Sequence, residues 1–485
     1  MALGFLDIKN RAPPQILYNV VTTTHNRQEE DALMSIIRQQ SLFDMDELFK
    51  MEPTHRFNAI ISTINLEPIW FLFRKHTNVG APRELNYGAM VYSLIARVVE
   101  RIPTVKDLVK RLKHDPIFRF DCGFLHSDIL PSEASYSRMI RLISESDAMT
   151  RVHDELILLA IQEEHITEEN IAIDATHFEA RDRARVSEKK EKPAPKKRGR
   201  KPKAEREQWL KDKQAEEEAR PIYEKEIVHQ LSESVETLFE EAPLEPQWGV
   251  KKNSDGKNFF WFGYKAHLAV SAKSQYILAG LMTSGNLNDG KAAIPLLKKI
   301  EQDLPAQFTA GLFDAGYDYD PIYQQLSNQN LQAVIPYNRR NEGEIVGYDE
   351  YFAPTCVLEY SYRYDSFDLK YKSLKYTRPK ECQTCPLQYD SLCQKTYKIR
   401  KSTDIRKYTF PARGSKKWDE LYKERTAVER VNAYLKEFFG LNNVRHRTGK
   451  KAKLHFQLVA LVYNASKLAT DRIKIAIEQQ SLQVA

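Results

Sequence analysis

The sequence predicts an α/β protein in which helices flank a mixed sheet, with a helical domain before the sheet and a small β-rich insertion inside it. Three patterns lead to this prediction. Residues 1–160 repeat apolar side chains at helical spacing. Residues 171–338 then place apolar strands and amphipathic helices in the order strand, strand, strand, helix, strand, helix, strand. Residues 341–415 carry few helix signals. Alternation of strands and helices, together with an antiparallel hairpin, is typical of a mixed sheet covered by helices.

The N-terminal domain, residues 1–160, is expected to be helical throughout its ordered part. Residues 85–102 and 104–115 carry clear amphipathic patterns, and Thr104 and Ser132 are suitable N-caps. A further helix is expected over residues 153–164, where it leads into the first strand.

The sheet is expected within residues 161–340. Its predicted elements are a buried strand at 171–175, a hairpin from residue 258 with its turn at Lys273 and Ser274, a helix at 289–304, a strand ending at Asp314, a helix at 321–329 and a strand at 331–338. A Pro-rich stretch with blocks of charge, residues 183–250, interrupts this core. We interpret that stretch as a linker or a long, partly helical insertion.

The last part of the chain returns to helices after the insertion. Residues 341–415 are rich in Tyr, Lys and Cys, which favours a β-rich insertion. Residues 418–440 are predicted to form one long amphipathic helix that stops at Gly440, and residues 454–478 a last helix. We assign residues 416–485 to the C-terminal helices of the core.

Composition restricts the class of protein. The 485 residues are 42% hydrophobic and 29% charged, which are ordinary values for a globular protein. No apolar run approaches the roughly 18 residues of a membrane span, and the N-terminus lacks a secretory signal. Five cysteines in a chain of this length fit a reducing cytosol. We therefore expect a soluble, cytoplasmic protein without a membrane partner.

Charge is distributed very unevenly along the chain. The formal net charge is only +7. Residues 189–203 hold nine Lys or Arg against one Glu, whereas residues 215–245 hold ten Glu against two Lys or Arg. Residues 401–453 hold fifteen Lys or Arg against six Asp or Glu, a net charge of +9. Basic blocks of this kind indicate a polyanion partner, most simply nucleic acid, although solvated helix faces and a disordered insertion explain charge alone equally well.

Acidic residues at two strand ends are the most informative feature. Asp174 and Asp314 each close an apolar strand, a position suited to binding a ligand or an ion, but each taken alone is more simply a turn residue. On the predicted long helix, Tyr422, Arg425, Glu429 and Lys436 fall within an arc of about 60° at about 100° per residue. An apolar stripe lies beside that arc. The bland alternative is a solvated helix face with one Arg425–Glu429 pair.

These motifs resemble a known family. The spacing Y-x2-R-x3-E-x6-K, here Tyr422, Arg425, Glu429 and Lys436, is similar to the signature of a large group of bacterial insertion-sequence transposases of the DDE type. The contexts IAIDATHFEARD and GLFDAGYDYDP resemble the family's first and second acid motifs, and the resemblance extends over about residues 30–470. It implies a ribonuclease H-like core in which Asp174, Asp314 and Glu429 form a catalytic triad that binds two Mg²⁺ or Mn²⁺ ions.

The resemblance also implies an activity and its partners. A transposase of this type cuts double-stranded DNA at the terminal inverted repeats of its insertion sequence and joins the 3′-hydroxyl to target DNA. Tyr422, Arg425 and Lys436 are then expected to hold DNA phosphates, together with Arg445 and Arg447 just beyond the helix. Chemistry at two DNA ends implies a homodimer on DNA, in the nucleoid of a bacterial cytoplasm.

Two other functions remain open at this point. One is a nuclease with the same core that cuts without joining, and the other is a domesticated DNA-binding protein without catalysis. In the N-terminal domain, Lys106, Lys110 and Lys113 share one helix face, which makes that face a candidate for DNA binding. His177, Asp182, Asp318 and Asp320 are rival metal ligands, but their positions past the strand ends favour turn or supporting roles.

Cysteines cluster in the β-rich insertion. Cys382 and Cys385 form a C-x2-C pair, and Cys393 and Cys356 complete a possible set of four thiolates for a structural Zn²⁺. Free thiols or a redox pair are the competing interpretations. Cys122 lies alone in a helical context and is expected to be a small buried hydrophobic residue.

Overall fold

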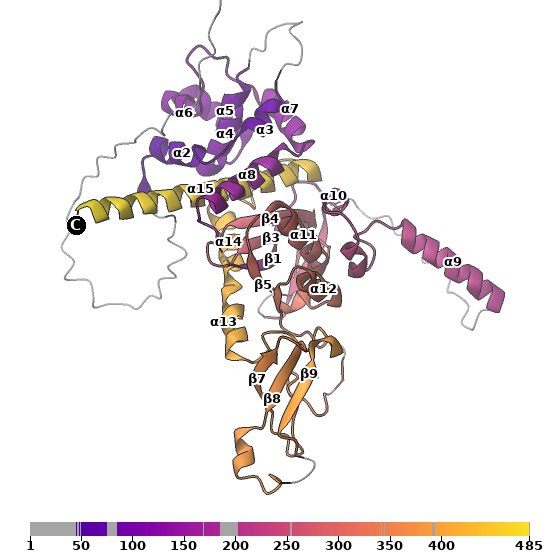
Figure 1. The fold of residues 1–485 in the computed structure, drawn as a ribbon. Coiled ribbons are helices and arrows are strands. Elements are labelled where there is room, and N and C mark those ends of the chain that lie inside the picture. Colours follow the sequence, from indigo (N-terminus) through magenta and orange to yellow (C-terminus); the bar gives the residue numbers. More distant parts are fainter. Residues whose placement is uncertain are drawn as a thin grey trace, which may run out of the picture. The chain divides into compact units, whose positions relative to one another are not determined.

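The computed structural model describes residues 45, 48, 50–74, 85–167, 169–184, 202–252, 255–340, 342–343, 345–389 and 393–484 (Figure 1). Residues 42–485 belong to one compact unit. The basic stretch at 189–201 lies outside the described residues. The division of the chain at residues 160, 340 and 415 stays a prediction.

Helices make up the described part of the N-terminal region, as predicted. They are α2 (Pro53–Ile61), α3 (Glu67–Phe71), α4 (Tyr87–Val99), α5 (Val105–His114), α6 (Pro116–Asp121), α7 (Glu133–Ser144) and α8 (Ala148–Gln162). Both predicted N-caps are confirmed: the side chain of Thr104 accepts a hydrogen bond from the Asp107 amide at 3.1 Å, and that of Ser132 from the Ser135 amide at 3.2 Å. These bonds satisfy amide groups that have no partner within the first helical turn.

A six-stranded mixed sheet follows. Its strands are β1 (Glu169–Glu179), β2 (Gln247–Lys252), β3 (Asn258–Ser271), β4 (Ile277–Ser284), β5 (Phe308–Leu312) and β6 (Gln332–Val334). β3 runs antiparallel to β1, β2 and β4. β5 runs parallel to β1, and β6 runs parallel to β5. The order β4–β3–β1–β5–β6 is that of a ribonuclease H-like sheet, and β2 extends the far end of β3.

Helices cover the sheet on both faces, so β3 and β4 are buried on each side. The 3₁₀ turn η3 (Asp289–Ala292) leads into α11 (Ala293–Asp303), which packs on β3 and β4, and α12 (Asp320–Asn328) packs on α11. α14 (Thr426–Glu437) lies against β1 and β3, and α15 (Gly449–Val484) lies against β4.

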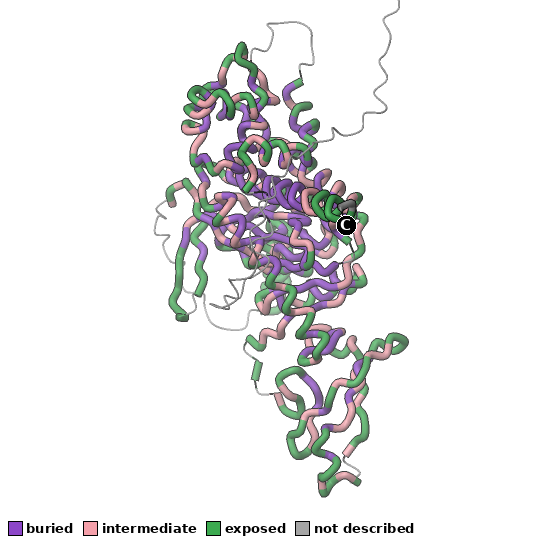
Figure 2. Tube along the Cα trace, turned by 90° about the vertical axis from the view of Figure 1, so that its left-hand side faces the viewer, coloured by how far each residue is buried: buried purple, intermediate pink, exposed green. Residues whose placement is uncertain are grey.

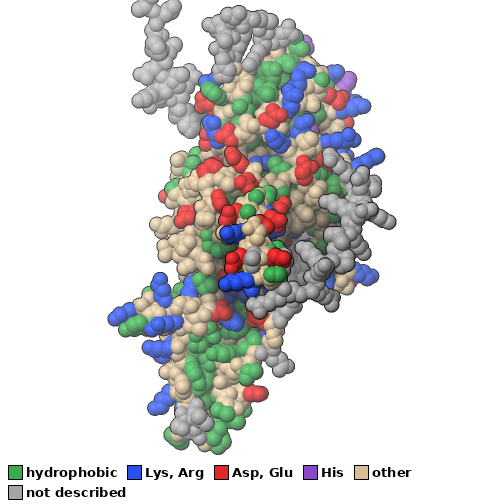
Figure 3. Space-filling model, turned by 90° about the vertical axis from the view of Figure 1, so that its right-hand side faces the viewer, with side chains coloured by type: hydrophobic (Ala, Val, Ile, Leu, Met, Phe, Trp, Pro, Cys, Tyr) green, Lys and Arg blue, Asp and Glu red, His purple; other side chains and the backbone are tan. Residues whose placement is uncertain are grey.

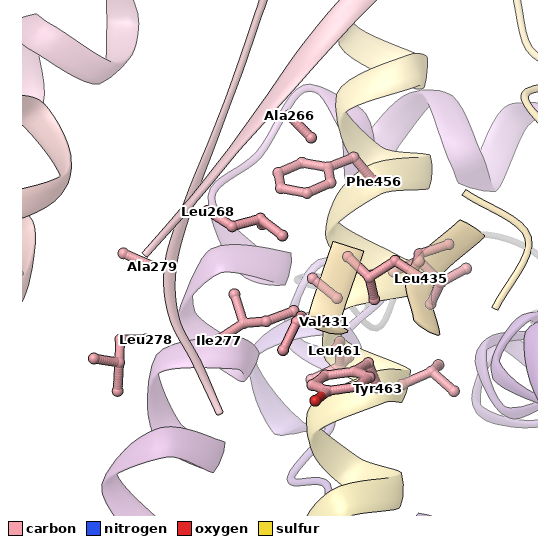
Figure 4. Close-up of a cluster of buried hydrophobic side chains, with 14 of the residues drawn as sticks. Ala266, Leu268, Ile277, Leu278, Ala279, Val431, Leu435, Phe456, Leu461 and Tyr463 are labelled. Carbon is pink, nitrogen blue, oxygen red and sulfur yellow. The ribbon is translucent and has the colours of Figure 1, made fainter. Parts of the chain in front are cut away.

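The main core forms where α14 and α15 meet the sheet. Figure 4 shows its side chains, which come from β3, β4, α14 and α15: Ala266, Leu268, Ile277, Leu278, Ala279, Val431, Leu435, Phe456, Leu461 and Tyr463. α15 also packs against α2, α4, α7 and α8. This one helix therefore joins the N-terminal helices to the sheet that carries the acids.

The β-rich insertion is confirmed as a separate small sheet. It consists of β7 (Arg363–Asp368), β8 (Ser373–Thr377) and β9 (Thr396–Arg400), paired antiparallel in that order. Figure 2 shows buried residues concentrated in the six-stranded sheet and its helices, with few in the insertion. The charged segment before β2 contains α9 (Lys203–Ala219), η2 (Ile227–Leu231) and α10 (Val235–Glu240), and it ends where β2 begins at Gln247, not at 250.

The predicted single helix over residues 418–440 is wrong. The structure has α13 (Lys416–Glu424) and α14, separated at Arg425. The Arg425 amide donates to the Tyr422 carbonyl and the Val428 amide to the Arg425 carbonyl, so tighter i to i−3 bonds interrupt the α-helical ladder. The break lets α13 contact β5 and β6 while α14 lies on β1 and β3. Gly440, with φ of +69°, still ends the segment, as predicted.

Candidate active site

Two parallel strands bring the predicted aspartates to the same edge of the sheet. Ala172 of β1 lies opposite Leu312 of β5, and Asp174 and Asp314 each stand two residues further along. Asp174 is still within β1, paired with Leu268 of β3. Asp314 follows β5 and starts the 3₁₀ turn η4 (Ala315–Tyr317), where its Oδ1 accepts the Gly316 amide at 2.7 Å. The strand register alone therefore makes the two carboxylates neighbours.

Burial and mutual repulsion make this an unfavourable place for two negative charges. The pKa of Asp174 is raised to about 6, chiefly by burial and also by the charge of Asp314, against the opposing effects of the Ala175 amide and Arg425. Burial likewise raises the pKa of Asp314, against the hydrogen bond from Gly316 and the positive charges of Arg425 and Lys251. A cation that enters between the two carboxylates therefore stabilises their charged form.

The start of α14 faces this pair with alternating charges. Arg425 donates from Nη2 to Glu429 Oε1 at 2.6 Å, and the side chain of Glu429 is 50% exposed. The guanidinium of Arg425 also lies 5.4 Å from the ring centre of Tyr422, which stacks on Trp418. Burial lowers the pKa of Lys436, with Lys251 acting in the same direction and Asp174 opposing it. The negative charge of Asp174 therefore interacts with both Arg425 and Lys436.

Glu429 does not form a three-carboxylate cluster with the two aspartates in the structure. Across the parts of the chain that the structure describes, no three His, Cys, Asp or Glu side chains stand close enough to hold a metal ion. Glu429 is instead bonded to Arg425. The structure thus brings Asp174, Asp314, Arg425 and Lys436 together and links Glu429 to them through Arg425.

Three charged residues beside the acids were missed by the sequence analysis. Asp289 raises the pKa of both Asp174 and Asp314, and its Oδ1 accepts a 2.7 Å hydrogen bond from Lys265 Nζ. Lys251, on β2, acts on Asp314. Asp289 looks like an ordinary helix-start residue in the sequence, and Lys251 lies just after the stretch 183–250 that was interpreted as an insertion. The sequence around Asp289 and Lys251 gives no indication that these residues lie near the two aspartates.

The rival ligands have other partners. Asp318 is fully buried and pairs with Arg406 at 2.7 Å, and Asp182 accepts the Thr448 amide at 3.1 Å. The His177 ring packs on Trp261 with 4.6 Å between ring centres, and burial lowers its pKa to about 4. Asp320 is exposed in the first turn of α12. These contacts support structural roles for Asp318, Asp182 and His177.

Arg445 and Arg447 lie between α14 and α15, and both are exposed. Arg445 Nε donates to Asn443 Oδ1 at 2.6 Å, and its carbonyl accepts from Arg181 Nη1 at 2.7 Å. Lys453, further along the same basic segment, is half-buried, and burial lowers its pKa. The segment therefore presents its first two arginines to solvent and turns Lys453 inward.

The predicted cysteine cluster also comes together. Cys356, Cys382, Cys385 and Cys393 line one cavity in the insertion, and all are free thiols. Burial raises the pKa of Cys382, and the other three thiols raise it further. Cys122 is fully buried, as predicted.

Comparison with known families decides the class of protein. The model of the Transposase DDE domain family matches residues 166–465, well over half of the chain. The chain belongs to the DDE transposase family. A second family model, Transposase domain (DUF772), matches residues 46–142 of this transposase. No curated protein matches the chain.

Membership confirms the predicted family and fold class. The chain is an insertion-sequence DDE transposase with a ribonuclease H-like mixed sheet, and proteins of this family bind DNA and generally use divalent metal ions. Within the described ranges, no helix combines the length and apolar character needed to cross a membrane.

Proposed function

We propose that this transposase cuts DNA at the terminal inverted repeats of its insertion sequence and joins the 3′-hydroxyl to target DNA. Asp174, Asp314 and Glu429 hold two Mg²⁺ or Mn²⁺ ions in this proposal. The observation that carries it is the register of β1 and β5, which sets two half-buried carboxylates side by side where β5 ends. Their raised pKa values report a site that favours positive charge.

The donor set fits hard divalent cations. All three side chains offer carboxylate oxygens, which Mg²⁺ and Mn²⁺ prefer over nitrogen or sulfur. Two such ions, when bound, activate the attacking oxygen and stabilise the leaving oxygen of the phosphodiester. The attacking group is water for cleavage and a DNA 3′-hydroxyl for joining, so the chain needs no nucleophile of its own.

Glu429 can change partner at little cost. Its side chain is half exposed and its bond to Arg425 is an i, i+4 pair on a helix surface, an interaction worth only about 0.3–0.5 kcal/mol. If Glu429 turned to bound cations, Arg425 would lose that acceptor and would be free to bind a DNA phosphate. A planar guanidinium suits a phosphate because it can donate two parallel hydrogen bonds.

The remaining positive groups are proposed to hold the DNA. Lys436 on α14 and Lys251 on β2 lie beside the acids, and the neutral Tyr422 is included because its ring contacts Arg425. Arg445 and Arg447 follow α14 and would contact the flanking duplex. Contacts of this kind position the backbone and carry no base sequence. Two DNA ends require two active sites, so we propose a homodimer on DNA.

The test uses a labelled duplex that carries the element's end, with Mg²⁺ or Mn²⁺. Wild type is compared with Asp314→Asn, and Asp320→Asn is the matched control because Asp320 is exposed and lies six residues further along the chain. We expect nicked and joined products from wild type and the control, and none from Asp314→Asn. Nicking without joining would favour the nuclease, and DNA binding without either product would favour the non-catalytic protein.

A further inference from the structure

One end of the β-rich insertion gathers four of the five cysteines around a single cavity of about 100 Å³. Cys356 comes from the chain before β7. The other three, Cys382, Cys385 and Cys393, come from the segment between β8 and β9. Two segments separated by two strands of the small sheet thus present sulfur to the same space.

Hydrogen bonds fix the backbone around these cysteines. The Cys356 amide donates to the Tyr360 carbonyl and the Glu359 amide donates to the Cys356 carbonyl, both at 2.9 Å, so Cys356 begins a tight turn. Cys382 lies in the 3₁₀ turn η5 (Lys380–Gln383), and the Gln388 amide donates to the Cys385 carbonyl at 3.1 Å. Arg378 Nη2 donates to the Cys393 carbonyl at 2.6 Å. On the cysteines these hydrogen bonds involve only main-chain atoms, so none of them occupies a sulfur. All four sulfurs are therefore available as ligands.

The insertion has little apolar core with which to hold these segments. Its buried cluster consists of Phe352, Ala353, Tyr362, Leu374, Tyr376, Tyr408 and Ala412. Around the cavity itself, Val357 and Leu358 are 67% and 46% exposed. Figure 3 shows hydrophobic side chains uncovered on the insertion, at the bottom of that view, with Lys and Arg along one edge. Small domains with cores of this size commonly need a disulfide or a metal for stability.

We propose that Cys356, Cys382, Cys385 and Cys393 bind one Zn²⁺ ion that joins the turn before β7 to the segment between β8 and β9. Four thiolates are a tetrahedral ligand set that Zn²⁺ binds in structural sites. In the structure the sulfurs line the cavity, and no three of them stand close enough to hold an ion. Binding therefore draws the two segments inward. Each thiol gives up its proton as its sulfur bonds to zinc.

Zinc content is the first measurement. Reduced full-length protein is loaded with ZnSO₄, desalted and analysed by elemental mass spectrometry, for wild type, Cys385→Ser and Cys122→Ser. Cys385 is half-buried, whereas Cys122 is buried far away in the sequence and serves as the matched cysteine control. We expect one zinc ion per chain in wild type and Cys122→Ser, and loss of zinc in Cys385→Ser. Zinc at background level in wild type, or unchanged zinc in Cys385→Ser, would overturn the proposal.

A second measurement does not depend on how a variant folds. Wild type loaded with Co²⁺ in place of zinc is expected to show the visible absorption of tetrahedral cobalt and the near-ultraviolet band of thiolate charge transfer. A spectrum typical of six oxygen ligands would place the ion elsewhere and reject the site. Asp314→Asn must retain full zinc, because the proposed zinc site shares no ligand with the acids.

Discussion

Substitution of Glu429 by Gln separates catalysis from folding. The change keeps the shape of the side chain and removes its negative charge. In the structure this breaks one ion pair, Arg425–Glu429 at 2.6 Å, on a helix surface where Glu429 is half exposed. Such pairs contribute about 0.3–0.5 kcal/mol. A loss of that size lowers the melting temperature of a domain this large by no more than about 2 °C.

The effect on cleavage should be much larger. A carboxylate that holds a catalytic cation contributes several kcal/mol to the transition state. A loss of about 4 kcal/mol lowers the rate about 10³-fold, because each 1.4 kcal/mol corresponds to about a factor of ten. We therefore expect Glu429→Gln to bind the DNA end, to melt within about 2 °C of wild type, and to cut at least about 10³-fold more slowly.

The assay follows end-labelled DNA on a denaturing gel, with Mg²⁺ and then Mn²⁺, alongside thermal denaturation of the same samples. Glu437→Gln is the control, because Glu437 lies on the same helix, is exposed and undergoes the same substitution. Cleavage by Glu429→Gln within threefold of the control would show that Glu429 holds no catalytic ion. A large drop in melting temperature would instead mean that the Arg425–Glu429 pair supports the fold.

Three further predictions concern the stability of the fold and DNA binding. Lys299 bridges Asp154 at 2.9 Å and Asp303 at 2.5 Å, so Lys299→Met should reduce the free energy of unfolding by about 2–3 kcal/mol in denaturant titration. Burial raises the pKa of Asp154, but the interactions with His153 and Lys299 outweigh burial and leave the pKa below its ordinary 3.8. The contribution of these interactions to the free energy of unfolding is present above pH 3.8 and is lost as the pH falls through the lowered pKa. Lys299→Met should therefore lose less free energy of unfolding than wild type on acidification. Phe456→Ala should lower the free energy of unfolding by about 3–5 kcal/mol, since the ring is 2% exposed. Lys251→Ala should weaken DNA binding in a salt titration and reduce the slope by about 0.9.

The sequence predicted those parts of the site that have local signals. Asp314 could be found because it follows a short apolar strand. Asp174 could be found because it ends an apolar run, although the expectation that it closes its strand was wrong: β1 continues to Glu179. Asp289 and Lys265 could not, because their contact with each other and their approach to the acids depend on how β3 and the turn before α11 meet in space. The same applies to β2, which is short, polar and mostly exposed, and forms only by pairing with β3.

The helix break at Arg425 shows tertiary contacts prevailing over local preference. No Gly or Pro interrupts residues 416–437, so propensity favours one continuous helix. In the structure α13 contacts β5 and β6 and α14 contacts β1 and β3. The interruption between them is local, because Arg425 keeps helical dihedrals of φ −53° and ψ −29°.

Arg425 interacts with all three predicted acidic ligands. Positioned between two helices, it bonds Glu429 on one side and lowers the pKa of both Asp174 and Asp314 on the other. Without bound cations, Arg425 is therefore the positive charge that the three predicted ligands share. In the proposed function, cations held by the three carboxylates would take over this role, and the guanidinium would be free to bind a DNA phosphate. Arg425 would then become available to the DNA only in the metal-loaded enzyme.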